Sequence, residues 1–575
     1  MKNKSFFSGG MFASIGAAAV TAYMAYVLGQ HDERLYTLFV FTAISLAAAY
    51  YFKTKRDLAR LLEEVVEFWG SPITKKRNLN TVRRYFDAMK DKKKQFYIDD
   101  QTWQDLNMDE IYTVLDRNLT TAGEQVLYDM LRRPLLDREP LLARNRKIKL
   151  FQEDKALREK LQIALQNAGR LKEDDILDIL LMEHEYNPYM RMVCYLATAA
   201  PILILAAAPF VGSAVIMPFV FSLGLNVYIH INHAKKNGIN INSIGYLVHL
   251  IKAAGIISKI ESVELKSHLD ELGTIFDKVK RISKGIANIG VPEGADVIYD
   301  YVKIELLIEE RSYYRVINDV VKYRNDLIRM YDLLGELDSL LSIASYREEI
   351  EDYSEPEFIE GGRVFDVKGL FHPLLQEPVA NDIYIKNGGI IITGSNMSGK
   401  STFLRAAGVA ATMAQTIYTV TCDSYVGSFF KIMTSISPGD NIMGGKSYYL
   451  GEAEAILRII RDCNPNMPIL CIVDEIFRGT NPVERISASV EILNYLLKNN
   501  VAVLVATHDL ELTEVLKAQY ECYYFTESVD KTEGLQFDYI MRKGVSPTRN
   551  AIKVLSYLGY PEAIVNGAEK RSLNA

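Results

Sequence analysis

The sequence predicts a C-terminal α/β domain with a largely parallel sheet, an all-α region before it, and four apolar helices in its N-terminal half. From about residue 353 onward, short apolar runs alternate with helical stretches, as in βαβ units. Residues 101–190 and 231–345 carry apolar positions at helical period. Apolar stretches that reach the ~20 residues of one bilayer span occur at 6–29, 35–52 and 193–228.

The apolar stretches indicate two membrane hairpins. Residues 193–228 carry no charge and can hold two spans that turn near Pro209 and Gly212. Lys and Arg precede the first span and follow the second and the fourth, which predicts a multi-pass protein of the cell (inner or plasma) membrane with both termini in the cytoplasm. A buried helix pair is the alternative for each region. The predicted segments are a transmembrane hairpin (1–52), a basic juxtamembrane segment (53–100), a first helical part (101–190), a second transmembrane hairpin (191–230), a second helical part with a lever (231–350) and the α/β domain (351–575).

The charge pattern restricts the partners. The net charge is −6, so no global field attracts nucleic acid. Residues 53–97 are locally basic, with 13 Lys or Arg against 6 Asp or Glu. Beside a membrane, the simplest partner for such a segment is anionic lipid, and nucleic acid is the alternative. The five cysteines occur singly and without CxxC spacing, so we expect neither a disulfide framework nor a zinc site.

A phosphate-binding motif follows the apolar run 389–393. It fits G-x-x-x-x-G-K-[ST], in which glycines let backbone N–H groups approach phosphates. The lysine reaches the β and γ oxygens, the final hydroxyl serves Mg²⁺, and the next helix directs its positive end at the anion. This predicts ATP and Mg²⁺ as ligands. The motif residues are Gly394, Ser395, Asn396, Met397, Ser398, Gly399, Lys400 and Ser401, with Thr402 next.

Two further buried runs end in residues suited to nucleotide hydrolysis. Asp474 ends the run "ILCIVD", where a metal-bound water is a plausible partner for its carboxylate. Glu475 follows and can polarise the attacking water as a general base. His508 follows the run "VAVLVAT" and can sense the γ-phosphate, although a lone histidine is more often structural. The strands are expected at "GIIIT", "FFKIMTSI", "ILCIVD", "AVLVAT" and "CYYFTES", with helices starting at Ser401, Glu452 and Arg485.

These motifs resemble the MutS family of DNA mismatch-repair ATPases. "GSNMSGKSTFLRAAGVAATMAQ" is similar to that family's phosphate loop and helix, and "ATHDLELT" to its histidine switch. "SYYLGEAEAI" resembles its signature loop, which implies that Ser447 reaches the γ-phosphate bound by a partner subunit. "VDEIFRGTNPVERISAS" resembles its Walker B segment, which implies that Arg478, Gly479 and Thr480 lie near the dimer contact. "TVLDRNLTTAGEQVLYDMLRRPL" and "LGELDSLLSIASY" are similar to its helical core and lever.

The resemblance implies an α/β P-loop NTPase domain of the ABC and MutS type that hydrolyses ATP in a homodimeric composite site. Lys400, Glu475 and His508 are then catalytic, while Ser401 and Asp474 hold the metal. Double-stranded DNA is the partner that the family implies. Ser395 and Ser398 replace the family's usual Pro and Gly. Val379 stands near the position at which the family often has an aromatic residue against adenine.

The chain also departs from the family at larger scale. No mismatch-reading domain or DNA clamp is recognisable, and apolar spans interrupt the helical core. The interpretation is therefore a membrane-anchored MutS-like ATPase associated with DNA. Two alternatives are a transporter-type ATPase and a nucleotide-dependent switch that scaffolds a membrane complex without acting on DNA.

Overall fold

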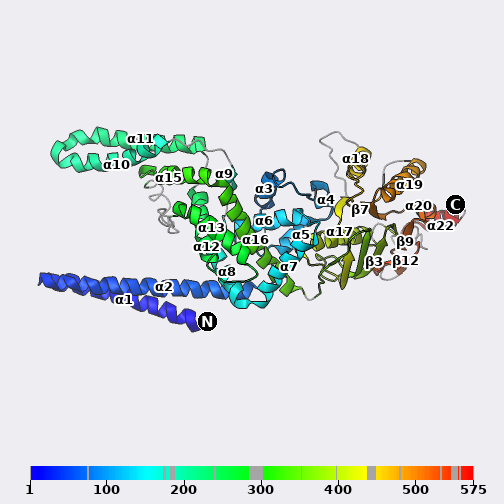
Figure 1. Cartoon of the computed structure of the whole chain (residues 1–575), viewed down its shortest axis with the longest axis horizontal. Coiled ribbons are helices and arrows are strands. Elements are labelled where there is room, and N and C mark those ends of the chain that lie inside the picture. Colours follow the sequence, from blue (N-terminus) through cyan, green and yellow to red (C-terminus); the bar gives the residue numbers. More distant parts are fainter. Residues whose placement is uncertain are drawn as a thin grey trace. The chain divides into compact units, whose positions relative to one another are not determined.

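The computed structural model describes the chain as two compact units (Figure 1). Unit 1 comprises Met1–Ser71, Leu119–Thr121 and Phe151–Leu334, and unit 2 comprises Pro72–Asn118, Ala122–Leu150 and Gly335–Ala575. The helical segments expected before the α/β domain are thus shared between the units. The structure describes all residues except 1, 31, 74–76, 172–175, 182–187, 238–240, 284–301, 303, 351, 396–397, 437–447, 478–480, 531–533, 546–554, 556–558 and 574–575.

Unit 1 is helical throughout its described residues. Helix α12 lies at its centre and packs against α8, α9, α13 and α15, with Leu247, Leu250 and Ile251 fully buried. The described helices are α1 (Lys2–Gly29), α2 (Phe39–Phe68), α8 (Lys155–Ala168), α9 (Ile176–Leu181), α10 (Pro188–Val211), α11 (Ile216–Asn237), α12 (Ile241–Ile257), α13 (Lys266–Ser283), α15 (Ile308–Lys322) and the first part of α16 (Arg324–Glu349).

Two helical hairpins of unit 1 expose apolar side chains. Helices α1 and α2 run along each other (Figure 1), and the hydroxyls of Thr21 and Thr42 meet at 3.0 Å. Helices α10 and α11 are joined by the 3-10 turn η2 (Gly212–Val215), where the turn was predicted. Phe210 is 90 % exposed and Met217 81 % exposed beside that turn. Among the described residues, the segments long and apolar enough to cross a membrane are Phe6–Gly29, Tyr36–Phe68 and Tyr189–His233.

Helix α2 extends further than the predicted span. The sequence suggested an end at residue 52, whereas the helix continues to Phe68. The first basic residues of the juxtamembrane segment, including Lys53 and Lys55, therefore lie on the same helix as the apolar stretch, and both are exposed. Beyond its end, the ring of Trp69 stacks 4.0 Å from the Arg158 guanidinium of α8.

Unit 2 begins with short helices that pack on the second part of α16. Gly335 permits this approach, because a Cβ there would lie 2.7 Å from the Ala122 carbonyl oxygen. The Ser342 hydroxyl donates to the Leu115 carbonyl at 2.6 Å. The short helices are α3 (Leu79–Met89), α4 (Asp100–Asp105), α5 (Met108–Leu115), α6 (Thr121–Arg132) and α7 (Arg138–Glu153).

The six-stranded sheet forms the core of the α/β domain. Its strand order is β12-β9-β4-β8-β7-β6, and all neighbouring pairs are parallel except the β12–β9 pair. Every residue of β4, β7 and β8 is buried, which fits their continuous runs of Ile and Val. The strands are β4 (Gly389–Thr393), β6 (Lys431–Ser435), β7 (Ile469–Asp474), β8 (Val501–Ala506), β9 (Tyr520–Tyr524) and β12 (Arg542–Lys543).

The helices of the α/β domain start earlier than predicted. Helix α17 (Lys400–Ile417) packs against β6, β7 and β8, and starts one residue before Ser401. Helix α18 (Tyr448–Arg461) starts before Glu452. Helix α19 (Pro482–Lys498) starts before Arg485, because the Asn481 side chain caps it and Pro482 suits its first turn. The remaining described helices are α20 (Leu510–Leu516) and α22 (Glu562–Leu573).

A second, smaller sheet combines three strands that precede the phosphate loop with one that follows it, and it was not predicted. Its strand order is β1-β5-β2-β3, with β2 antiparallel to both neighbours. A separate antiparallel pair, β10 and β11, follows β9. The strands are β1 (Glu357–Phe358), β2 (Val364–Leu370), β3 (Asn381–Lys386), β5 (Ser424–Gly427), β10 (Glu527–Asp530) and β11 (Gly534–Phe537).

Candidate active site

Three adjacent strands end at the candidate site. In the parallel ladder, Ala506 of β8 lies opposite Ile392 of β4 on one side and Asp474 of β7 on the other. The residues that follow these strands therefore meet at one edge of the sheet. This edge, at the carboxyl ends of parallel strands, is where open α/β sheets bind ligands. The phosphate motif, the Asp474–Glu475 pair and His508 are thus brought together.

The phosphate loop needs its glycines. Gly394 has a φ of +140° and Gly399 a φ of +103°, a backbone region that residues with a Cβ rarely adopt. A Cβ on Gly394 would also lie 2.7 Å from the carbonyl oxygen of Phe525, the residue after β9. Gly399 precedes α17, so the first N–H groups of that helix face the loop. The two glycines at the described ends of the loop therefore have backbone conformations that suit a phosphate-binding loop.

Lys400 is held close to the loop. Its side chain is nearly buried, and its ammonium donates to the carbonyl oxygens of Gly394 and Ser395 at 2.6 and 2.7 Å. The two serines at unusual positions support the loop: Ser398 donates its hydroxyl to the Ser395 carbonyl at 2.8 Å, and Ser395 donates to Glu527 at 2.8 Å. Both serines therefore make polar contacts at the described ends of the loop.

Ser401 and Asp474 lie together, as a metal site requires. The Ser401 hydroxyl donates to the Asp474 carboxylate at 2.5 Å, although 73 residues separate them. Asp474 is 7 % exposed and ends the buried strand β7. A hydroxyl and a carboxylate at a phosphate loop are oxygen ligands of the kind that Mg²⁺ takes with nucleotides. Both residues therefore fit the roles predicted for them.

Glu475 and His508 form a hydrogen-bonded pair. Glu475 has a φ of +65°, and its backbone N–H donates to the Ala506 carbonyl at 2.9 Å. Its side-chain Oε1 lies 2.9 Å from Nδ1 of His508. The hydrogen bond to this carboxylate raises the pKa of His508 above its ordinary value, against the opposing effect of partial burial. The predicted base and the predicted sensor thus touch each other.

A second ion pair fixes the segment that carries His508. Arg485 of α19 donates to both carboxylate oxygens of Asp509, at 2.9 and 2.5 Å. The backbone N–H of Asp509 donates to the Thr507 hydroxyl at 3.0 Å, and the Thr507 N–H donates to the Ile392 carbonyl at 3.0 Å. His508 is therefore held between β4 and α19, with its own ring half exposed.

Tyr539 is a site residue that sequence reasoning missed. A Cβ on Gly399 would lie 3.1 Å from the Tyr539 ring, so this side chain borders the phosphate loop. Tyr539 has a φ of +54°, and its carbonyl accepts from the Asn381 amide at 3.0 Å. The same amide donates to the Val379 carbonyl at 3.2 Å. The Asn381 amide therefore joins the backbones of Tyr539 and Val379, while the Tyr539 ring lies beside Gly399. No local pattern in the sequence signals this arrangement.

Several predicted residues lie outside the described part of the chain. In the phosphate loop these are Asn396 and Met397. The same holds for Ser447 and for the expected dimer-contact residues Arg478, Gly479 and Thr480. Thr402 is described and exposed in the first turn of α17.

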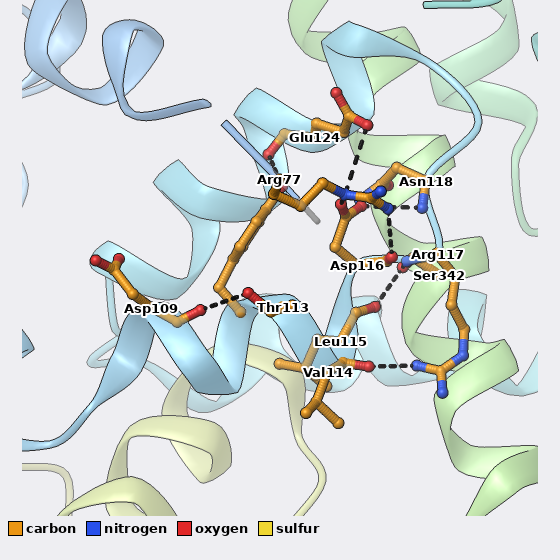
Figure 2. Close-up of polar contacts among 11 residues, drawn as sticks. Arg77, Asp109, Thr113, Val114, Leu115, Asp116, Arg117, Asn118, Glu124 and Ser342 are labelled. Atoms are coloured by element: carbon orange, nitrogen blue, oxygen red, sulfur yellow. Dashed lines mark hydrogen bonds and ion pairs between the residues drawn. The ribbon is translucent and has the colours of Figure 1, made fainter. Parts of the chain in front are cut away.

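Several cations of the basic segment 53–100 are paired with carboxylates and are therefore not available to a ligand. Arg77 contacts the Asp116 carboxylate and lies 3.8 Å from Glu124, and Figure 2 shows its guanidinium directed between them. Arg77 is 8 % exposed and Asp116 fully buried. Arg83 pairs with Asp87 and Asp100, and Lys93 with Asp129. These cations stabilise unit 2. The exposed lysines that remain for a ligand include Lys53, Lys55, Lys92 and Lys94.

Comparison with known proteins identifies two family regions. Residues 76–344 match the family model for MutS domain III, and residues 390–574 match the model for MutS domain V. The first match runs from just before α3 to near the end of α16 and leaves out α1 and α2, and the second begins within the strand before the phosphate loop.

Individual relatives agree with these matches. The chain is 31 % identical over 275 residues to the DNA mismatch repair protein MutS of Thermotoga petrophila, which covers 45 % of the chain and 33 % of that protein. It is 30 % identical over 278 residues to the human MutS protein homolog 4, covering 44 % and 28 %. It is 31 % identical over 278 residues to MutS of Fervidobacterium nodosum, covering 47 % and 33 %. The chain matches about a third of the length of these relatives.

Proposed function

Because the chain belongs to the MutS family, we propose that it is a membrane-anchored ATPase in which ATP binding and hydrolysis drive movements of its helical segments. The observation that carries this proposal is the meeting of three strand ends. They bring together a phosphate loop, a serine–aspartate pair and a glutamate–histidine pair. Each pair suits a separate part of nucleotide hydrolysis.

The phosphate loop and the start of α17 would bind the nucleotide. The N–H groups of the helix start and the Lys400 ammonium would contact phosphate oxygens, and the glycines leave room for that approach. Ser401 and Asp474 would hold Mg²⁺, which supplies charge neutralisation at the phosphates when bound. The Tyr539 ring would contact the adenine from beside Gly399.

Glu475 and His508 would act in the hydrolysis of ATP. Glu475 would orient and polarise the attacking water. Its contact with His508 keeps the carboxylate in one orientation, and a protonated imidazole would favour the ionised carboxylate. His508 would in turn respond to the γ-phosphate, since its ring is half exposed at the strand edge.

The site would be completed by a second copy of the chain. Ser447 follows β6 and precedes α18 along the sequence, and the family resemblance places it at the nucleotide of the partner subunit. Two ATPase domains would then pair head to tail as a homodimer. ATP would close the pair, and hydrolysis would open it.

The exposed apolar hairpins support a membrane location. Apolar surfaces of this extent on α1, α2, α10 and α11 are unfavourable in water, and a lipid bilayer would cover them. Four spans would keep both termini in the cytoplasm. Lys53 and Lys55 continue α2 beyond its apolar stretch, where anionic headgroups would be within reach.

Biochemical assays on the full chain in detergent test the enzymatic part. Wild type should bind ATP with Mg²⁺ and release phosphate, and Glu475→Gln should bind ATP but release phosphate far more slowly. A wild type as slow as Glu475→Gln would favour the non-hydrolysing switch instead. Absence of nucleotide binding in the wild type would refute the proposal.

Double-stranded DNA is the partner that we propose for the helical segments. Two of the three relatives named above are DNA mismatch repair proteins by name, and the described exposed lysines offer a sequence-blind contact to phosphates. Gel shifts with matched and mismatched duplexes at several salt concentrations should show binding that weakens steeply with salt. If no duplex is shifted even at low salt, DNA is not the partner, and the scaffold or transporter-type alternatives are favoured.

A further inference from the structure

Three polar residues of helix α11 lie on one face of that helix. Asn226, His230 and His233 are spaced by four and then three positions, which places them on the same side of an α-helix. Asn226 is fully buried and donates its side-chain amide to the Glu305 carbonyl at 2.8 Å. Ile231, on the other side of α11, is exposed. The polar face of α11 is therefore directed into the protein.

A buried carboxylate of α15 meets this face. Oε1 of Glu310 lies 2.8 Å from Nδ1 of His230 and 4.0 Å from Nδ1 of His233. The Glu310 side chain is 1 % exposed and that of His233 is 7 % exposed. Helix α15 also packs beside α10, the other helix of the hairpin (Figure 1). An ionised carboxylate at this depth needs a nearby cation to offset the loss of its hydration.

The permanent cation next in the chain does not serve Glu310. The Arg311 guanidinium lies 4.7 Å from the centre of the Tyr195 ring on α10 and donates to the Leu306 carbonyl at 3.4 Å. Among the described residues, the groups of opposite charge that come within 4.0 Å of the Glu310 carboxylate are the two imidazoles. The charge on this carboxylate is therefore compensated only when an imidazole carries a proton.

The other titratable groups that face this cluster carry no positive charge. On α10 this group is Cys194. On α15 they are Tyr313 and Tyr314, whose rings pack edge-on against the His233 ring at 4.9 and 5.4 Å. Ahead of α15 lies Glu305, and burial raises the pKa of its carboxyl group. None of these groups can replace a protonated imidazole.

Two buried atoms of the cluster have no hydrogen-bond partner among the described residues. They are Oε2 of Glu310 and Nε2 of His233. Such atoms cost stability unless a ligand satisfies them. In the part of the chain that the structure describes, no group of three His, Cys, Asp or Glu side chains has the arrangement that holds a metal ion. A proton is the remaining small cation, and an imidazole can take one near neutral pH.

Helix α15 connects the hairpin to the centre of unit 1. It packs against α10 on one side and against α12 and α13 on others. The Thr198 hydroxyl of α10 donates to the Leu306 carbonyl at 3.1 Å, just ahead of α15. This bond and the bond from Asn226 do not involve a titratable side chain. The contact at Glu310 adds a part of the attachment that depends on protons.

We propose that His230, His233 and Glu310 form a proton-binding site that fastens α15 to the α10–α11 hairpin. A proton on either imidazole places a cation beside the carboxylate and strengthens the contact. As the pH rises through the ordinary titration range of histidine, at about 6.5, that cation is lost while the carboxylate stays buried. The hairpin is therefore attached more firmly at low pH than at high pH. Neither nucleotide binding nor a second copy of the chain is needed for this effect.

Cys194 reports on this contact in the native chain. It is fully buried on α10, one turn before Thr198, whose hydroxyl bonds to the segment ahead of α15. Alkylation of the full chain in detergent by N-ethylmaleimide, quantified for each cysteine by mass spectrometry, measures how often Cys194 becomes accessible. Each rate is divided by the rate in Glu310→Gln at the same pH, so that the intrinsic pH dependence of thiol reactivity cancels. The glutamine carries no charge and needs no cation.

The rate ratio for Cys194 in the wild type should rise about tenfold between about pH 6.0 and 8.5. His230→Gln should reduce this rise, because only the more distant imidazole remains. His230→Gln/His233→Gln should abolish it and give a high ratio at every pH. His249→Gln is the matched control, since it changes an exposed histidine of α12 and should behave as the wild type. Cys463, which lies in unit 2, should give a ratio near one throughout.

Several results would overturn the proton site. These are a wild-type ratio for Cys194 that does not change with pH, an equal rise in the double histidine variant, and a Cys463 ratio that follows that of Cys194. A more than twofold change in the Cys194 rate when Zn²⁺ is added to the chelated protein at constant pH would show that a metal ion is the ligand instead. If Glu310→Gln does not fold, the double histidine variant becomes the reference. The wild-type ratio should then rise from about one tenth at low pH to near one at high pH, and a constant ratio would refute the site.

Discussion

His508 and Glu475 are joined by a hydrogen bond of 2.9 Å between the imidazole Nδ1 and the carboxylate Oε1. They follow adjacent strands, β8 and β7, and 33 residues separate them in the chain. The titratable imidazole of His508 is therefore in direct contact with the carboxylate of the predicted catalytic base. The ionisation of the imidazole and the orientation of the base are therefore linked, which gives the first two predictions.

Glu475→Gln should separate ATP binding from hydrolysis. The amide keeps the shape of the side chain but cannot take a proton from water. We expect kcat to fall by about 10²- to 10⁴-fold, as for other general bases, with little change in the Kd for ATP. Phosphate release and equilibrium binding of labelled ATP measure the two quantities. Equal losses in both would show that Glu475 acts in binding.

The His508–Glu475 pair should stabilise the protein more at low pH than at high pH. The folded-state pKa of His508 is raised above its ordinary value of 6.5. The stabilisation is therefore fully present below pH 6.5 and lost as pH rises through the raised pKa. Because the ring is half exposed, the effect on Tm should be small. The Tm of wild type minus that of His508→Gln, measured from pH 5.5 to 8.5, should decrease with pH; a flat or rising difference contradicts the pair.

Gly394→Ala should abolish nucleotide binding. The new methyl would meet the Phe525 carbonyl oxygen at 2.7 Å on a backbone with φ +140°, so the loop must move. Gly567→Ala in α22 is the matched control, because a Cβ there meets no atom within 4 Å. ATP binding measured by calorimetry should be lost in the first variant and unchanged in the second. Retained binding in Gly394→Ala would show that the loop tolerates the shift.

Tyr539→Ala should weaken ATP binding, whereas Tyr539→Phe should not. The ring borders Gly399, and its stacking on a base would not require the hydroxyl. We expect the Kd for ATP to rise by about 3- to 10-fold in the alanine variant, from the loss of roughly 1 kcal/mol of aromatic contact. Inorganic triphosphate binding is the control and should be equal in all three proteins. An equal loss of affinity for triphosphate in Tyr539→Ala would show that Tyr539 supports the loop and does not contact the base.

Arg77→Met should destabilise unit 2. It would leave the fully buried Asp116 carboxylate without its cation, at a cost of about 3–5 kcal/mol in the free energy of unfolding. Denaturation followed by Trp103 fluorescence in a Trp69→Phe background measures this. Arg83→Met removes a partly exposed cation and should cost less than about 1 kcal/mol. Arg77→Met/Asp116→Asn should recover part of the loss; no difference between Arg77→Met and Arg83→Met would refute the argument.

The sequence predicted the centre of the α/β domain well, because buried parallel strands leave a clear local pattern. The runs that become β4, β7 and β8 are continuous and apolar, and each ends where its functional residue begins. The start of α18 was placed too late, since Gly451 interrupts its first turns in the sequence. The small sheet was missed because its strands are not continuous apolar runs, and because β5, which lies between β1 and β2, follows them only after the phosphate-loop helix.

Residues whose role depends on distant partners could not be assigned from the sequence. Arg77 was grouped with a basic segment, but its partner Asp116 lies 39 residues away. Asp105 stands in an ordinary polar stretch, and the groups at the end of strand β6 that donate to its carboxylate follow more than 320 residues later. The Tyr539 ring borders Gly399, and the Tyr539 carbonyl is held by the side-chain amide of Asn381, which lies 158 residues earlier in the chain. Such contacts leave no trace in local composition.

The position of α4 beside β6 bears on how the nucleotide domain could be produced in isolation. Strand β6 is the last strand of its sheet, and its outward N–H at Thr434 is taken up by Thr102. A fragment that began at residue 351 would lack this cover and would present an uncovered strand edge to other molecules. Such a fragment should aggregate through that edge during expression, unless residues 99–106 are supplied as a fused or co-expressed peptide.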